Sequence, residues 1–103
     1  MKIYKNKNHT IYNDDIFKCF SKIKDKTIDL VFADPPYNIG KDFDGLKDKK
    51  NEQDFLLWTY KWIDEVYRVL KENGSFYLMN STQSMPFLDL YCRKYFNIIS
   101  RIV

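Results

Sequence analysis

The motif Asp34-Pro35-Pro36-Tyr37 combines side chains and a backbone that are suited to binding a planar amine. Asp34 provides a carboxylate that accepts hydrogen bonds. Two successive prolines fix φ and remove two N–H groups, which leaves the Pro35 carbonyl as a second acceptor with restricted freedom. Tyr37 adds an aromatic face beside the two acceptors. The motif predicts a pocket for a planar group bearing –NH₂, with a turn that merely ends a strand as the alternative.

The elements around this motif follow the pattern of an α/β fold. The apolar run 27–33 directly before it predicts a strand buried on both faces of a parallel sheet, which the prolines end. Short apolar strands alternate with amphipathic helices in the order βαβαβαβ, which predicts an α/β layer fold with a mostly parallel sheet. The expected strands are 9–13, 27–33, 75–80 and 97–103, and the expected helices cover 15–24, 51 to a glycine cap at Asn73-Gly74, and 84 onward.

Polar residues follow three of the expected strands. In parallel α/β sheets, ligands bind beyond the carboxyl ends of the strands. We therefore expect Asn13-Asp14, the motif 34–37 and Asn80-Ser81 to lie along one edge of the sheet. Asp14 is a candidate for contact with a cofactor, or else the N-cap of the following helix.

Two further groups of residues have competing interpretations. Residues 38–50 form a long loop rich in Gly, Asp and Lys. Asn38 and Lys41 at its start are candidates for contact with a substrate, and a solvated loop is the alternative. Four aromatic residues at helical spacing are expected in the core rather than at a binding surface, and these are Trp58, Trp62, Phe87 and Tyr91.

Composition excludes several classes of protein. Of the 103 residues, 45% are hydrophobic and 30% charged, a composition that excludes a disordered protein. The length fits one domain at most, and we expect that domain to cover residues 1–103. No apolar run approaches the ~20 residues of a membrane-spanning helix, and the N-terminus lacks a secretory pattern, so we expect a cytoplasmic protein without a membrane partner. Two cysteines and one histidine predict no metal site.

Residues 30–40, Leu-Val-Phe-Ala-Asp-Pro-Pro-Tyr-Asn-Ile-Gly, resemble the catalytic motif of the amino-methylating DNA methyltransferases, which modify adenine N6 or cytosine N4. Two further segments are similar to those that flank this motif in the family. They are Asn13-Asp14 with the helix after it, and residues 62–77. The resemblance covers roughly residues 10–103. With this motif near the N-terminus, the chain is similar to the permuted subclass, in which the catalytic region comes first.

The resemblance implies S-adenosylmethionine as cofactor and double-stranded DNA as substrate. Asp34 and the Pro35 carbonyl would accept hydrogen bonds from the amine of a flipped base, and Tyr37 would stack on that base. Asp rather than Ser at the first motif position favours adenine over cytosine. The resemblance implies that Asp34, Pro35, Pro36 and Tyr37 are the catalytic residues. It implies that Asp14 and Asp34 contact the cofactor and that Tyr37, Asn38 and Lys41 contact the substrate. The implied function is site-specific adenine-N6 methylation in a restriction–modification system.

The chain also departs from the family pattern. Its glycines are Gly40, Gly45 and Gly74, so the family's glycine-rich cofactor loop is missing, and no target-recognition region is visible. The family's sheet order implies further strands between those supplied here. We therefore expect a partial Rossmann-like methyltransferase fold that requires the rest of the methyltransferase chain or a complementary subunit. By itself the chain is expected neither to bind S-adenosylmethionine tightly nor to methylate DNA.

Two alternative functions remain open. A pocket with two acceptors suits any planar –NH₂, so the substrate can instead be RNA or a protein glutamine amide. A non-catalytic nucleic-acid-binding remnant would keep the fold without the cofactor site.

Overall fold

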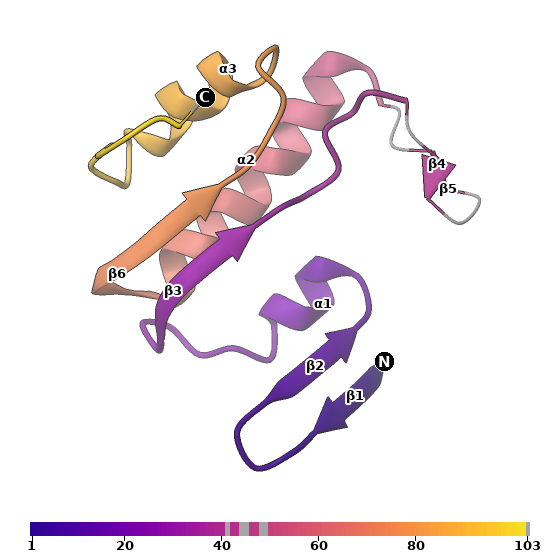
Figure 1. The fold of residues 1–103 in the computed structure, drawn as a ribbon, viewed down its shortest axis with the longest axis vertical. Coiled ribbons are helices and arrows are strands. Elements are labelled where there is room, and N and C mark those ends of the chain that lie inside the picture. Colours follow the sequence, from indigo (N-terminus) through magenta and orange to yellow (C-terminus); the bar gives the residue numbers. More distant parts are fainter. Residues whose placement is uncertain (41, 44–45, 48–49, 103) are drawn as a thin grey trace.

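The computed structural model describes residues 1–40, 42–43, 46–47 and 50–102. The described strands form three two-stranded sheets, β1–β2, β3–β6 and β4–β5. Figure 1 shows a long helix packed against the β3–β6 sheet, so the expected α/β class is confirmed. The elements are β1 (Lys2–Lys5), β2 (Thr10–Asn13), α1 (Ile16–Phe20), β3 (Ile28–Ala33), β4 (Asp42–Phe43), β5 (Leu46–Lys47), α2 (Glu52–Val69), β6 (Leu70–Leu78) and α3 (Met85–Cys92).

The β3–α2–β6 unit is the centre of the fold. β3 and β6 are parallel, with Val31 opposite Phe76 and Ala33 opposite Leu78. Helix α2 connects the two strands and packs across one face of their sheet (Figure 1). The parallel pairing expected of these two strands is confirmed.

The hydrophobic core lies between α2, α3 and the covered face of this sheet. Trp62 is buried as expected, and Trp58 and Tyr91 are partly buried against the core. Phe87 is 44% exposed, so its assignment to the core is wrong. It lies in the first turn of α3, at the outer margin of the contact with α2. The buried cluster consists of Phe20, Trp62, Ile63, Val66, Val69, Leu70, Leu88 and Cys92.

Stacked tyrosines join α3 and the residues after it to α2. The rings of Tyr60 and Tyr91 lie 4.1 Å apart between centroids, and those of Tyr67 and Tyr95 lie 4.3 Å apart, both nearly parallel. The Tyr91 hydroxyl donates a hydrogen bond of 2.6 Å to Asp64 of α2, and this bond raises the pKa of Tyr91. The stacking and the hydrogen bond fix the orientation of α3 on α2.

Helix α2 ends earlier than its sequence pattern predicts. Its last residue is Val69, and the extended Leu70 caps it, so the expected cap at Asn73-Gly74 is wrong. Gly74 lies inside β6, where a Cβ would come within 2.8 Å of the Leu70 side chain and 3.1 Å of the Asp29 carbonyl. The glycine at this position therefore permits a close approach between β6 and β3 rather than a left-handed helix end.

Arg68 holds the connection from α1 to β3 against α2. Its guanidinium donates to the carbonyls of Phe20 and Ile23 at 2.9 Å and to the carboxylates of Asp25 and Glu65. Helix α1 itself ends at Phe20, short of the expected residue 24, and tighter turns continue to Ile23. One planar side chain thus binds the carbonyl at the end of the short helix, which also accepts from the Ile23 N–H, and the Ile23 carbonyl after it.

Replacing Arg68 with lysine is expected to lower the free energy of unfolding by about 1–3 kcal/mol, because a lysine ammonium lacks the fork that reaches both carbonyls. Urea unfolding monitored by circular dichroism measures the change. Arg93→Lys is the matched control, since Arg93 forms an exposed pair with Asp89 and its replacement should cost less than about 0.5 kcal/mol. Equal losses in the two variants would contradict this role for Arg68.

The N-terminal strand β2 does not join the parallel sheet. It pairs instead with β1 in an antiparallel hairpin in which Ile3 lies opposite Tyr12. The Asn6 side chain accepts hydrogen bonds from the backbone N–H groups of Asn8 and His9 and so stabilises the turn. The expected order βαβαβαβ is therefore wrong at its first strand, because a nearby β-prone segment supplies an antiparallel partner.

The expected last strand is also absent from the described residues. Residues 97–102 have no regular structure, and Ile99 is 95% exposed. A strand requires a neighbour that offers backbone hydrogen bonds, and the described part of the chain places none beside this segment. Val103 lies outside the described residues.

The second face of the β3–β6 sheet carries exposed apolar side chains. Leu30 and Phe32 of β3 and Tyr77 of β6 are each more than half exposed, and the Phe32 and Tyr77 rings stack at 6.4 Å. The apolar pattern of β3 predicts burial on both faces, and for this face the prediction is wrong among the described residues, because no element of theirs covers it.

The described ranges lack two kinds of feature. No helix in them is long and apolar enough to cross a membrane. Nor do they bring three or more His, Cys, Asp or Glu side chains together as metal ligands.

Candidate functional site

The carboxyl ends of β3 and β6 meet at one edge of their sheet. Ala33 lies opposite Leu78, and the Met79 N–H donates a hydrogen bond of 2.9 Å to the Ala33 carbonyl. Asp34 and Asn80 follow these residues, so the motif and Asn80-Ser81 emerge side by side, as the strand-end rule predicts.

Asn13-Asp14 follow a strand of a different sheet. The arrow of β2 points the same way as those of β3 and β6 in Figure 1, but β2 shares no backbone ladder with either. β1 pairs with one edge of β2, and the other edge has no partner strand among the described residues. Because the expected neighbours of β2 lie outside these residues, the placement of Asn13-Asp14 along the edge shared by the other two polar segments stays a prediction.

Tyr37 is hydrogen-bonded to Asp34 within the motif. Its hydroxyl donates to Asp34 Oδ1 at 2.6 Å, and this bond raises the pKa of Tyr37. The tyrosine therefore occupies one carboxylate oxygen and leaves Oδ2 as a second acceptor. Asp34 is exposed and Tyr37 half-buried, so the pair lies at the surface beyond the end of β3.

Asn38 closes the base of the loop that follows the motif. Its backbone is left-handed, with φ of 63°, a conformation that asparagine tolerates better than most residues. The side chain donates to the Lys50 carbonyl at 3.0 Å and accepts from the Lys50 N–H at 2.6 Å. We call this pair of bonds the Asn38–Lys50 clasp. Contact of the Asn38 amide with a substrate would compete with the clasp.

The loop between the two halves of the clasp contains a short antiparallel ladder. Asp42 of β4 lies opposite Lys47 of β5, and Phe43 lies opposite Leu46. The sequence pattern predicts no strand here, because each strand has only two residues. Lys41, a predicted substrate contact, lies outside the described residues.

Asp14 is held by groups near the N-terminus. It accepts a hydrogen bond of 2.7 Å from the Asp15 N–H, and it lies 3.6 Å from the Met1 amino group and 3.9 Å from Lys18 Nζ. The Asp15 N–H is the main reason that the pKa of Asp14 is lowered. The N-cap of α1 is Asp15, which accepts from Phe17, so the interpretation of Asp14 as the N-cap is wrong.

Asn80 has a buried amide donor without a partner among the described residues. Its Oδ1 accepts from the Ser81 N–H at 2.8 Å, whereas Nδ2 is buried and makes no hydrogen bond. Such orphan donors are costly, and the described residues contain one other, Trp62 Nε1, which lies in the core. The only sequence signal for Asn80 is its place at the end of β6, next to the motif.

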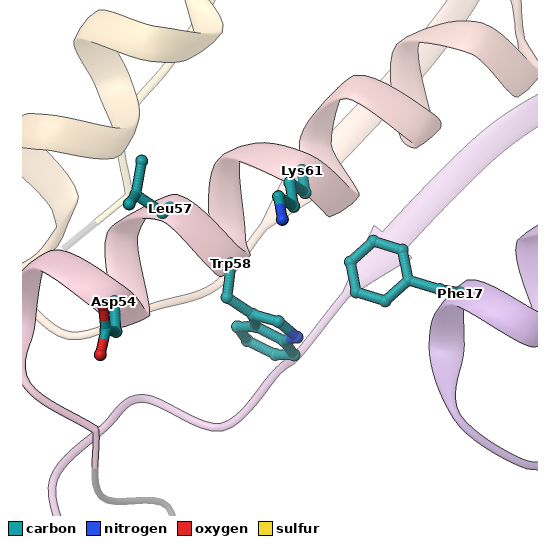
Figure 2. Close-up of a pocket in the computed structure, with 5 residues that line it drawn as sticks. All are labelled: Phe17, Asp54, Leu57, Trp58 and Lys61. Atoms are coloured by element: carbon teal, nitrogen blue, oxygen red, sulfur yellow. The ribbon is translucent and has the colours of Figure 1, made fainter.

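The described residues at this edge offer hydrogen-bond acceptors but no cradle for a cofactor. Gly40 has a left-handed φ of 81°, but no atom lies within 4 Å of the position a Cβ would take, so close approach of another group does not explain this glycine. Two shallow hollows lie elsewhere, along α2. One of them, shown in Figure 2, is lined by Phe17, Asp54, Leu57, Trp58 and Lys61.

The known proteins that this chain resembles are methyltransferases. Residues 28–103 match a family model described as DNA methylase, of the N6/N4 methyltransferase type. The chain is 53% identical over 98 residues to the DNA adenine methyltransferase YhdJ of Escherichia coli, covering 95% of this chain. It is 40% identical over 88 residues to the type II methyltransferase M.BamHI of Bacillus amyloliquefaciens and 37% identical over 82 residues to M1.MboII of Moraxella bovis, covering 84% and 79% of this chain.

The chain spans about a third of the length of the E. coli relative and less of the other two. The matched segments cover 33%, 21% and 30% of the three relatives in the same order. Similarity to them therefore concerns the segment that contains β3, α2 and β6.

Proposed function

The chain belongs to the DNA methylase family of N6 and N4 amino-methyltransferases, and on this premise we propose that it forms the amine-activating part of an adenine-N6 DNA methyltransferase. The observation that carries the proposal is the position of Asp34 and Tyr37. They lie beyond the end of β3, beside the end of β6, and are joined by a hydrogen bond of 2.6 Å.

Asp34 and the Pro35 carbonyl act on the target amine. The amine of adenine is a weak nucleophile because its lone pair is delocalised into the ring. Hydrogen bonds from its two N–H groups to these acceptors favour a pyramidal nitrogen, and the lone pair then points at the methyl group that is transferred. The Tyr37 hydroxyl fixes one carboxylate oxygen, which directs the other towards the amine.

Tyr37 also provides the stacking surface for a base rotated out of the duplex, a contact worth about 1–3 kcal/mol. Pro36 stiffens the turn that sets the ring beside Asp34. Asn38 positions the next loop through the clasp, and Lys41 remains a proposed contact with DNA. Aspartate at position 34 and the adenine specificity in the name of the E. coli relative support adenine over cytosine.

We assign S-adenosylmethionine as the methyl donor. When bound, it supplies an electrophilic methyl group on a sulfonium sulfur. Asp14 and Asp34 are the proposed contacts of this chain with the cofactor. The described residues form no cradle for its methionine part, so that part must bind to structure other than these residues.

The open sheet supports a partial Rossmann-like fold completed by further structure. The exposed face formed by Leu30, Phe32 and Tyr77 and the unpaired outer edges of β3 and β6, within the described residues, require cover. We propose that the rest of the methyltransferase chain, or a complementary subunit, provides it. The type II methyltransferases among the relatives support a place in a restriction–modification system, acting on double-stranded DNA in the cytoplasm.

A chimera tests the proposed function. The 103 residues replace the matching third of the E. coli relative, and transfer of labelled methyl to duplex DNA is measured. We expect N6-methyladenine in the digested product. A folded chimera that methylates RNA or a glutamine amide instead assigns the alternative substrate, and one that binds DNA without methyl transfer identifies a non-catalytic remnant.

Replacing Tyr37 with phenylalanine in the chimera is expected to lower kcat about three- to tenfold with little change in KM for DNA, because the ring remains while its bond to Asp34 is lost. Tyr37→Ala should also raise KM, since it removes the stacking surface. As pH rises through the elevated pKa of Tyr37, the wild-type hydroxyl stops donating and activity falls; the Phe variant should lack this fall. Identical alkaline profiles would exclude the role given to the hydroxyl.

A further inference from the structure

Asn38 fastens the end of the motif to the residue that precedes the N-cap of α2. In the clasp its amide donates to the Lys50 carbonyl at 3.0 Å and accepts from the Lys50 N–H at 2.6 Å. Both ends of one planar amide are held, so rotation of this side chain breaks both bonds. Asparagine also tolerates the left-handed φ of 63° that the backbone adopts at this position.

The other half of the clasp is held by the start of α2. Lys50 is followed by the N-cap Asn51, whose side chain accepts from the Asp54 N–H at 2.8 Å and donates to Asp54 Oδ2 at 2.9 Å. The Lys50 ammonium lies 5.8 Å from the centre of the Trp58 ring, within the range of a cation–π contact. Phe55, in the first turn of the helix, is buried. The clasp therefore joins the motif to a helix whose start is fixed by a cap and by packing.

Tyr37 lies between two fixed points of the backbone. Figure 1 shows the chain running from the end of β3 towards the start of α2. Pro36 restrains the backbone before Tyr37, and the clasp restrains it after Tyr37. Between these points the Tyr37 hydroxyl donates to Asp34 Oδ1 at 2.6 Å. This bond is exposed to water, which competes for both groups, so it depends on a backbone that presents the two groups to each other.

We propose that Asn38 is a positioning residue for methyl transfer, because the clasp keeps the Tyr37 hydroxyl on Asp34 and so leaves the second carboxylate oxygen for the target amine. This role rests on the proposed function, in which Asp34 accepts a hydrogen bond from that amine. The Asn38 amide makes no contact with substrate in this role, since such a contact would have to replace the bonds to Lys50. Asn38 thus acts on the reaction through Tyr37.

Replacement of Asn38 by glycine in the chimera tests this role, because glycine keeps the left-handed backbone and loses the clasp. We expect kcat to fall about three- to tenfold, as in Tyr37→Phe, while KM for DNA stays within about twofold of the parent. The double variant with Tyr37→Phe and Asn38→Gly should stay within about twofold of the slower single variant, because both changes remove the same bond.

Asn6→Gly is the matched control. The Asn6 side chain also holds a turn, by accepting from the backbone N–H groups of Asn8 and His9, but this turn belongs to the β1–β2 hairpin. Its loss should leave kcat within about twofold of the parent, so a fall in kcat that is confined to Asn38→Gly does not arise from the loss of a turn in general.

A measurement that does not depend on methyl transfer separates this role from the proposed function. Isotope-labelled tyrosine reports the titration of Tyr37 by NMR, and the resonance is assigned by its absence from Tyr37→Phe. The bond to Asp34 raises the pKa of Tyr37 in the parent, so Asn38→Gly should move this titration to lower pH. An inactive parent chimera that still shows the shift would refute the proposed function and uphold the hold of the clasp on Tyr37.

Three results would overturn the positioning role. A Tyr37 titration that is unchanged in Asn38→Gly would mean that the clasp does not hold the hydroxyl on Asp34. A rise in KM for DNA with kcat unchanged would place the Asn38 amide on the substrate instead. Losses of kcat that multiply in the double variant would show that Asn38 acts independently of the Tyr37 hydroxyl.

Discussion

Replacement of Asp34 by alanine in the chimera is expected to reduce methyl transfer about a hundred- to a thousandfold while duplex binding stays within about twofold of the parent. The carboxylate accepts hydrogen bonds that strengthen as the amine nitrogen becomes pyramidal, so its loss affects the transition state more than the ground state. Single-turnover methylation with labelled S-adenosylmethionine measures the rate, and fluorescence anisotropy measures DNA binding.

Two variants make this result specific to position 34. Asp29→Ala is the matched control, because Asp29 lies on the same strand and its exposed carboxylate, within the described residues, bonds to Lys71 alone, at 3.0 Å. Its rate should stay within about twofold of the parent. Asp34→Asn keeps one acceptor oxygen and should fall between the parent and the alanine variant. An Asp34→Ala chimera as active as the Asp29→Ala chimera would exclude the role given to Asp34 in activating the amine.

Local sequence signals were sufficient to predict the elements of the central β3–α2–β6 unit. The apolar run before Asp34 predicts β3, and the helix expected from residue 51 is α2, capped by the Asn51 side chain, which accepts from the Asp54 N–H at 2.8 Å. The helix expected from residue 84 is α3, with Pro86 in its first turn. Each of these signals depends on residues within one element, so no knowledge of the rest of the fold is needed to interpret it.

The failures occur where a neighbour in space decides the structure. Gly74 resembles a helix cap in sequence, yet it lies inside β6, where a Cβ would come within 2.8 Å of the Leu70 side chain and 3.1 Å of the Asp29 carbonyl of β3. Residues 97–102 have the composition of a strand but no partner strand among the described residues. The β1–β2 hairpin was not predicted because it depends on the pairing of two short segments, which the apolar pattern within either segment does not reveal.

In the candidate site, too, local signals predict some features, and others depend on neighbours in space. The strand-end rule predicts that Asp34 and Asn80 emerge together. The bond from Tyr37 to Asp34 and the Asn38–Lys50 clasp were not predicted, because both depend on backbone angles after two prolines, including a left-handed Asn38. The orphan Nδ2 of Asn80 is likewise visible only once its burial is known.

Replacement of Leu88 by alanine is expected to lower the free energy of unfolding by about 2–5 kcal/mol. Leu88 is fully buried between α3 and the core, and truncation removes apolar contacts and leaves a cavity that the stacked tyrosines prevent from closing. A chain of this size has a total stability of about 5–15 kcal/mol. The loss therefore shifts the thermal midpoint by about 10 °C or more, measured by circular dichroism or calorimetry.

Leu90→Ala provides the control on the same helix, since Leu90 is 70% exposed and its truncation should cost less than about 0.5 kcal/mol. Equal effects at the two positions would mean that α3 is not docked on α2 in solution. The docking matters for the site because α3 follows directly from Asn80-Ser81, so undocking it releases the end of β6 beside Asp34. The Leu88→Ala chimera should therefore also lose methyl transfer, and lowering the temperature should restore part of it, whereas no temperature restores Asp34→Ala.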